Sequence, residues 1–298
     1  MNDATSGREL ALRRRMTEVL RATWTRDAAL ALVLTGWYYR YGLGRFRDHL
    51  YDTFDQKLMI YLLEWLRHSL LAGDVAHVFH PNVLYPNPNV LAWSDTLLGF
   101  LPIYGLLRSV TSNPILALNC TSFIAVFAGT LGMMRLGRGI TGRTSFVAGA
   151  VGGVGLLAAA MEGHFQFKSL CLLVWALYFA AQFARGSARA LPWFIALSAW
   201  LFLCSVYYAV MLAVFVVSSL LLALVVGRLR FVRWLKGTLA GIRPAPACLI
   251  VVGSLVPVLW VARHYLQVKN QFGGFPLDEM VTYSARLASL LDAPQTNT

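Results

Sequence analysis

The sequence predicts an all-α protein, a polytopic transmembrane helix bundle of about seven spans with two interfacial helices in its first outer loop. Hydrophobic residues make up 57% of the chain and charged residues only 13%, whereas soluble domains carry about 25% charged residues. The distribution of acidic residues agrees, because Glu162 is the single acidic residue between Asp95 and Asp278. Ionisable groups are costly in a bilayer, so we expect chemistry in the two stretches that hold carboxylates, 44–96 and the patch around Glu162.

The net charge of +12 does not indicate nucleic-acid binding. The basic residues form short clusters between apolar runs, which is the pattern of the positive-inside rule. No basic face with interleaved aromatic residues lies outside that pattern, so we expect no nucleic-acid partner. The four cysteines fall inside apolar runs without metal-ligand spacing, and we interpret them as inert residues.

The chain begins with a basic, cytoplasmic segment, 1–26, which leads into a first span near 27–43. The outer loop, 44–112, follows. Within it, residues 55–72 have the apolar spacing of an amphipathic helix lying on the membrane surface. The Pro- and Asn-rich stretch after it predicts an extended segment. We interpret 91–107 as a second surface or re-entrant helix.

The remaining spans follow from length and charge. The uncharged run 190–227 would measure about 57 Å as one helix, roughly twice the hydrocarbon thickness, so it must form two spans with a bend at 204–208. Sixteen of the 26 Lys and Arg residues fall in segments expected to be cytoplasmic, which gives an inside N-terminus and an outside C-terminus. The predicted module, 27–263, therefore has spans near 27–43, 113–134, 144–161, 168–184, 190–204, 206–227 and 245–263, and 264–298 forms an outer loop or tail.

This topology places both acidic stretches on the outer side. Asp52 and Asp55 follow the first span, and Asp55 also begins the amphipathic helix, where a carboxylate is favoured as a cap. The second patch contains Glu162, His164, Gln166 and Lys168. A carboxylate with an imidazole can orient a hydroxyl or hold a divalent cation, for which the ligands would be Asp55, Glu162 and His164. The alternatives are a simple helix cap and an ordinary polar loop.

Two further groups are candidates for substrate binding. Asp95 follows a turn-rich segment and either faces the site or caps the 91–107 helix. Arg263, His264 and Lys269 lie at the outer end of the last span. They would either neutralise a phosphate or anchor the helix at the interface.

The order of motifs resembles bacterial members of the GT-C superfamily of membrane glycosyltransferases. Residues 79–89 fit Phe-x-Pro-x-x-x-Tyr-Pro-x-Pro-Asn, and Leu-Ala-x-Ser-Asp follows at 91–95. Further motifs that carry the resemblance are Asn113-Pro114, the Leu-Gly-Arg-Gly-Ile-Thr-Gly turn at 136–142 and Gly-His-Phe-Gln at 163–166.

The resemblance implies a seven-span module that transfers a sugar from a polyprenyl-phosphate carrier to a glycan, lipid or protein acceptor. Asp55 best matches the acidic residue that activates the acceptor, and Glu162 and His164 match a second polar position. Family members usually continue with more spans, so the resemblance implies an N-terminal, truncated form, which puts catalytic competence in doubt. The implied location is the bacterial inner membrane, with membrane lipid as a partner and a divalent cation as the one candidate cofactor.

Two other functions remain open at this point. The chain would be a non-catalytic subunit of a glycan-assembly system if the fold survived without the chemistry. A lipid or solute transporter would place polar groups at mid-membrane, and the runs between 113 and 262 offer almost none.

Overall fold

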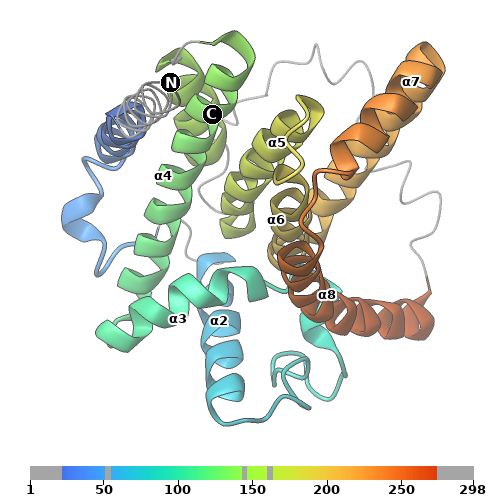
Figure 1. Cartoon of the computed structure of the whole chain (residues 1–298). Coiled ribbons are helices and arrows are strands. Elements are labelled where there is room, and N and C mark those ends of the chain that lie inside the picture. Colours follow the sequence, from blue (N-terminus) through green and yellow to red (C-terminus); the bar gives the residue numbers. More distant parts are fainter. Residues whose placement is uncertain (1–21, 51–54, 143–145, 160–163, 274–298) are drawn as a thin grey trace, which may run out of the picture.

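The computed structural model describes residues 22–50, 55–142, 146–159 and 164–273 (Figure 1). Across those residues the chain is helical and contains no strand. Four helical segments are long and apolar enough to cross a membrane: Pro114–Thr141, Phe165–Ala184, Val206–Gly227 and Pro244–Phe272. The all-α, membrane-type fold expected from composition is confirmed at this level.

The N-terminal helix occupies residues 22–38 and ends in turns and a short 3-10 helix, η1 (Leu43–Arg45). Tyr39 and Phe46 pack edge to face with their ring centroids 5.6 Å apart. The amide nitrogen of Asn119 donates to the carbonyl oxygens of Phe46 and His49, at 3.0 and 2.9 Å. The segment after the first helix is therefore attached to a neighbouring helix from the middle of the chain.

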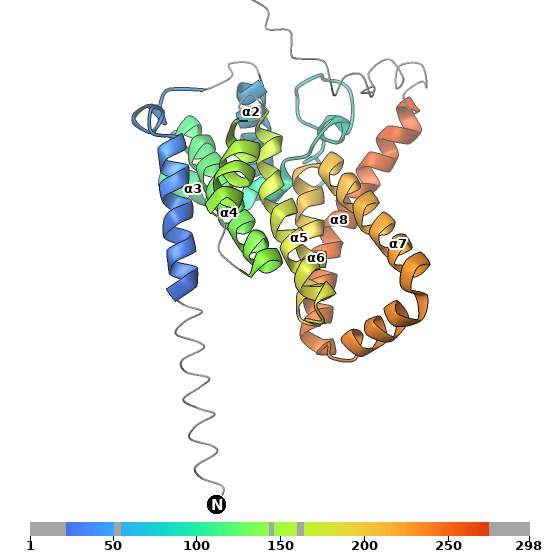
Figure 2. The same cartoon turned by 90° about the horizontal axis from the view of Figure 1, so that it is seen from above.

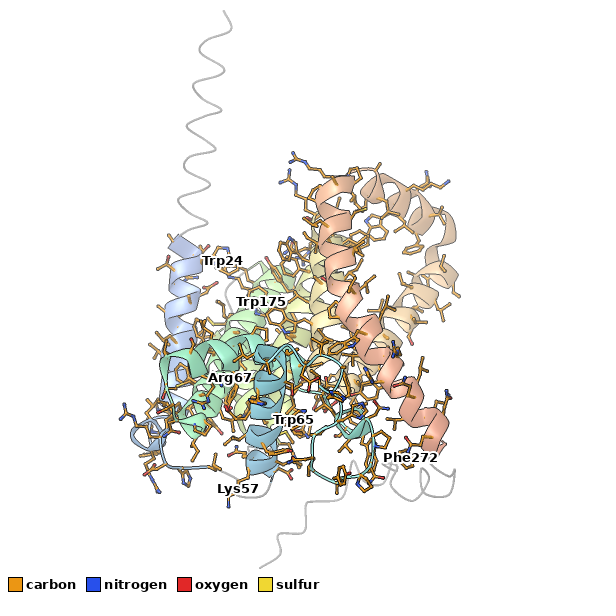
Figure 3. All side chains as sticks on the ribbon, turned by 90° about the horizontal axis from the view of Figure 1, so that it is seen from below. Trp24, Lys57, Trp65, Arg67, Trp175 and Phe272 are labelled. Carbon is orange, nitrogen blue, oxygen red and sulfur yellow. The ribbon has the colours of Figure 1, made fainter. Side chains whose placement is uncertain are left out.

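The amphipathic helix forms as predicted, as α2 (Asp55–Leu71). Its inner face carries Leu63 and Leu66, both fully buried, whereas Leu71 at its end is 73% exposed. The indole nitrogen of Trp65 donates to the carbonyl oxygen of Val78 at 2.9 Å and holds the following segment against α2. Figure 3 shows Trp65 along this helix, with Lys57 and Arg67 labelled beside it.

The expectation of one helix over 91–107 is wrong in detail. The stretch forms two 3-10 turns, η2 (Val90–Trp93) and η3 (Leu98–Phe100), and then α3 (Leu101–Val110). Ser94 is extended, and Leu97 has a φ of 58°, in the left-handed region. A continuous helix cannot pass through those backbone angles.

The rest of the chain forms a bundle (Figures 1 and 2). Asn113 caps its first helix by accepting a hydrogen bond from the Leu116 amide at 3.0 Å. The elements in order are α4 (Pro114–Thr141), the π-helix η4 (Ala148–Ala159), η5 (Phe165–Ser169), α5 (Leu170–Ala184), α6 (Ala190–Cys204), α7 (Val206–Leu239) and α8 (Pro244–Phe272).

The bend predicted inside 190–227 is confirmed. α6 ends at Cys204, Ser205 is extended with φ −153° and ψ 118°, and α7 begins at Val206. A second break occurs at Gly227, where φ is −139° and ψ is 36°. The membrane-length part of α7 therefore ends before its basic C-terminal turns.

Seven spans remain a prediction. α6 has 15 residues, or about 22 Å of helix, which is shorter than a hydrocarbon core of about 30 Å. The predicted spans 27–43 and 144–161 correspond to helical segments at 22–38 and 146–159, and neither is among the four membrane-length helices of the described residues.

The directions of α5 and α6 place His164 and the basic connection between these helices at opposite ends of the bundle. α5 begins beside His164 and ends at Arg185, and α6 begins after Arg189 and ends at the Ser205 bend. His164 therefore lies at one end of the bundle, whereas Arg189 lies at the other. Asp55 of α2 contacts His164, and in Figure 2 α2 lies at one end of the bundle and the α7–α8 connection at the opposite end.

A buried ion cluster at that opposite end was not anticipated from the sequence. Asp27 in the first helix is fully buried, and its Oδ2 lies 3.4 Å from Arg135 Nε and 3.6 Å from Arg138 Nη1 of α4. The Arg135 guanidinium stacks on Trp24, which in turn stacks on Trp175 (Figure 3). Arg135 is thus a buried residue and not a free loop charge.

Replacing Asp27 with alanine should lower the free energy of unfolding by about 3–5 kcal/mol, because Arg135 would remain buried without its counter-charge. Unfolding in mixed micelles with rising SDS content would measure this loss. The control is Asp48→Ala, which breaks an exposed contact with Arg45 and should leave stability nearly unchanged. Equal stability of the two variants would show that the Asp27 cluster contributes nothing to the fold.

Candidate functional site

Asp55 and His164 come together although they lie far apart in the sequence. Asp55 Oδ2 is 2.7 Å from His164 Nδ1. The two groups are in close contact, and the buried Nδ1 atom has no aligned hydrogen-bond partner. The side chains are 38% and 46% exposed, respectively, so each is partly accessible from outside although Nδ1 is not. The prediction that the outer-loop carboxylates and the 162–168 patch meet is confirmed for these two residues.

One hydrophobic cluster positions both members of the pair. Leu63 of α2 and Phe165 of η5 are buried in the same cluster, and the ring of Phe165 lies 4.6 Å from that of Phe100 between centroids. Asp55 is the first residue of α2, where the helix dipole favours a carboxylate. His164 immediately precedes η5 in extended conformation. The packing of Leu63 and Phe165 thus fixes where these two ends lie.

The turn after His164 contains polar atoms without hydrogen-bond partners. Within the described residues, Gln166 Oε1 and Ser169 Oγ are buried and accept or donate no hydrogen bond. Lys168 is only 3% exposed and points into the protein. Buried polar groups are normally satisfied by protein or by ordered water, so these two atoms are the places in the turn where an ordered water would bind.

A carboxylate network further along α2 was missed in the sequence. Glu64 of α2 accepts hydrogen bonds at Oε1 from the Tyr104 hydroxyl, at 2.6 Å, and from Arg108 Nε, at 2.5 Å. Burial favours the neutral acid, but the hydrogen bonds from Arg108 and Tyr104 outweigh it and lower the pKa of Glu64. The sequence did contain one indication of this network: Arg108 is the one charged residue between 96 and 134, and such an isolated charge needs a partner.

Asp95 caps α7, and not the 91–107 helix that the sequence predicted. It is 6% exposed, and its Oδ1 accepts a hydrogen bond from the Val206 amide at 3.0 Å. Burial raises the pKa of Asp95, and the hydrogen bond from the Val206 amide opposes that shift. The carboxylate therefore caps α7 at the bend, and not the predicted 91–107 helix.

The three candidates on α8 separate into two groups. His264 is buried, its Nδ1 lies 2.9 Å from Asn89 Oδ1, and its ring stacks on Phe79 at 3.8 Å between centroids. It anchors the 79–89 segment to α8. Arg263 and Lys269 are exposed at the same end of the helix.

The remaining candidates lie outside the described residues. Asp52 and Glu162 fall in 51–54 and 160–163. No group of three potential metal ligands occurs in the part of the chain that is described. Two ligand atoms on one octahedral cation at about 2.1 Å are about 3 Å apart, so the 2.7 Å contact of Asp55 and His164 fits direct pairing better than joint metal binding.

Comparison of the chain with protein-family models, with curated proteins and with solved structures found no match. The function is therefore inferred from the sequence and from the site geometry.

Replacing Glu64 with glutamine should destabilise the protein by about 1.5–3 kcal/mol at neutral pH, because Arg108 would lose its charged acceptor. The folded-state pKa lies below the ordinary 4.5, so Glu64 stabilises the fold above that value and ceases to do so as pH falls through the lowered pKa. The stability difference between wild type and E64Q should hold down to about pH 5 and shrink below about pH 4.5.

Thermal unfolding in detergent across this range would measure the difference. Asp74→Asn is the matched control, since Asp74 pairs with an exposed His77. A difference that stayed constant down to pH 3 would contradict the assigned linkage.

Proposed function

We propose that this chain is a membrane-embedded glycosyltransferase that moves a sugar from a polyprenyl-phosphate carrier to an acceptor hydroxyl. The observation that carries the proposal is the contact of Asp55 Oδ2 with His164 Nδ1, at 2.7 Å, with both side chains partly exposed. A reachable carboxylate–imidazole pair at the end of an apolar bundle suits proton transfer next to a lipid-borne substrate.

In the proposed reaction, Asp55 is the general base. It takes the proton of the acceptor hydroxyl while the acceptor oxygen bonds to the anomeric carbon of the sugar. The bond between that carbon and the phosphate oxygen breaks, and the phosphate leaves with the electron pair. His164, next to Asp55, stabilises the carboxylate and restricts its orientation.

The leaving phosphate needs cations nearby. Arg263 and Lys269 are exposed on α8, at the end where His264 contacts the outer-loop segment. They suit this role better than His264, whose ring stacks on Phe79 and whose Nδ1 contacts Asn89. Gln166, which is partly exposed in the turn that follows His164, suits contacts with sugar hydroxyls.

We further propose that the enzyme lies in a bacterial inner membrane with its N-terminus in the cytoplasm. The basic segments that include Arg138 and Arg189 fall at one end of the helices, and the Asp55–His164 pair falls at the other. The positive-inside rule then assigns the pair to the outer side.

A second candidate function is a non-catalytic subunit that packs against another membrane protein. It is favoured by the low burial of two membrane-length helices: only 6% of the apolar windows of Val206–Gly227 and of Pro244–Phe272 is buried, against 56% for Pro114–Thr141. Co-purification of a second transferase would support it, and sugar transfer by the purified chain alone would exclude it.

Changing Asp55 to asparagine should lower sugar transfer by about a hundredfold to ten-thousandfold, because the amide cannot accept the acceptor proton. The measurement is radiolabelled sugar transfer from a polyprenyl-phosphate donor in membranes that contain the native gene product. The control is Asp48→Asn, a nearby exposed carboxylate that pairs only loosely with Arg45.

His164→Gln tests the partner of the base. It should lower the rate less than Asp55→Asn does and should move the pH profile of transfer. Undiminished transfer by Asp55→Asn would remove Asp55 from the mechanism.

A further inference from the structure

A cavity of about 250 Å³ lies at the end of the bundle opposite to the Asp55–His164 pair. Its walls come from the first turns of α6 and α8 and from the connections that precede them. Arg189 and Trp193 line it on the α6 side, and Arg243, Ala247 and Ile250 line it on the α8 side. α5 separates the two sites, because it begins after His164 and ends just before the cavity.

The cavity has a cationic rim. The guanidinium groups of Arg189 and Arg243 are exposed, and neither forms an ion pair with a carboxylate among the described residues. The sequence contains no acidic residue between Glu162 and Asp278, so the surrounding helices supply no counter-charge of their own. Two arginines at one opening suit a phosphate, which the planar guanidinium binds through two parallel hydrogen bonds.

The rest of the lining is apolar. Trp193 is half exposed, and Ala247 and Ile250 face the same space. The exposed apolar residues further along α8, Leu249 and Val252, lie on another face of the helix and do not line the cavity. A free inorganic anion would use only the rim, whereas a lipid would use the rim with its headgroup and the apolar lining with its glycerol region.

We propose that this cavity binds the phosphate headgroup of an anionic membrane phospholipid, with Arg189 and Arg243 on the phosphate and Trp193 beside the glycerol region. Basic pockets between transmembrane helices bind such headgroups through the same chemistry. The site is separate from the proposed transferase site, and it stands or fails independently of that function.

Titration of the delipidated full chain with phosphatidylglycerol in detergent, followed by native mass spectrometry, tests the proposal. Arg189→Gln combined with Arg243→Gln should weaken phosphatidylglycerol binding about 25-fold, since each arginine contributes a factor of about five. The matched control is Arg185→Gln, in the same connection, whose guanidinium lies against Gly139 of α4 and does not line the cavity. Phosphatidylcholine should bind more weakly than phosphatidylglycerol.

A second variant separates the cavity from general attraction between charges. Ala247→Phe keeps both arginines and fills the space, so it should also weaken phosphatidylglycerol binding and remove the preference over phosphatidylcholine. Wild-type binding by either this variant or the double arginine variant would overturn the proposal. Competition by inorganic phosphate at equal concentration, with no preference for lipid, would overturn the lipid assignment in favour of a free-anion site.

Discussion

The packing of Phe165 against Phe100, in the cluster that also buries Leu63, is the contact on which the rest of the site depends. Leu63 belongs to the helix that Asp55 begins, and Phe165 directly follows His164. Neither polar residue could hold the other in place by itself, because an exposed ion pair contributes little free energy. The apolar contacts beneath them supply the rigidity, and the polar pair lies at the edge of those contacts, accessible from outside.

The cost of burying charge explains how the other ionisable residues are arranged. Asp27 is surrounded by arginines, Glu64 is hydrogen-bonded by Arg108 and Tyr104, and Asp95 caps a helix. Each of these carboxylates is used to join two segments, so none is available to a ligand without loss of structure. Asp55 at one end of the bundle, and Arg189 and Arg243 at the other, are partly or fully exposed and do not join two segments in this way. This contrast separates residues that hold the fold from residues that can bind substrate or lipid.

The sequence predicted those features that depend on local pattern. The onset of α2 at Asp55 follows from its apolar spacing, and the bend at Ser205 follows from the length of an uncharged run. The predicted seven-span topology also placed Asp55 and His164 on one side, and their contact agrees with that placement, but the span count itself stays a prediction. The Glu64–Arg108 and Asp27–Arg135 pairs were not, since residues far apart in the chain are paired by packing angles that periodicity does not contain. Asp95 illustrates the same limit: a capping residue is recognisable by type, but its helix lies much further along the chain.

The proposed transferase site needs lateral access from the bilayer, whereas the proposed lipid site needs α6 and α8 to stay close together. A polyprenyl carrier approaches through the bilayer, so the helices beside its site must leave a lateral path, and the low burial of α7 and α8 is consistent with one. At the basic end, α6 and α8 pack against each other and begin with arginines that line one cavity, with no carboxylate between them, so the two cations repel. A bound anionic headgroup would offset that repulsion and join the two helix starts. On this argument, lipid binding at the basic end would limit how far α8 can separate from α6, and α8 carries Arg263 and Lys269 at its other end.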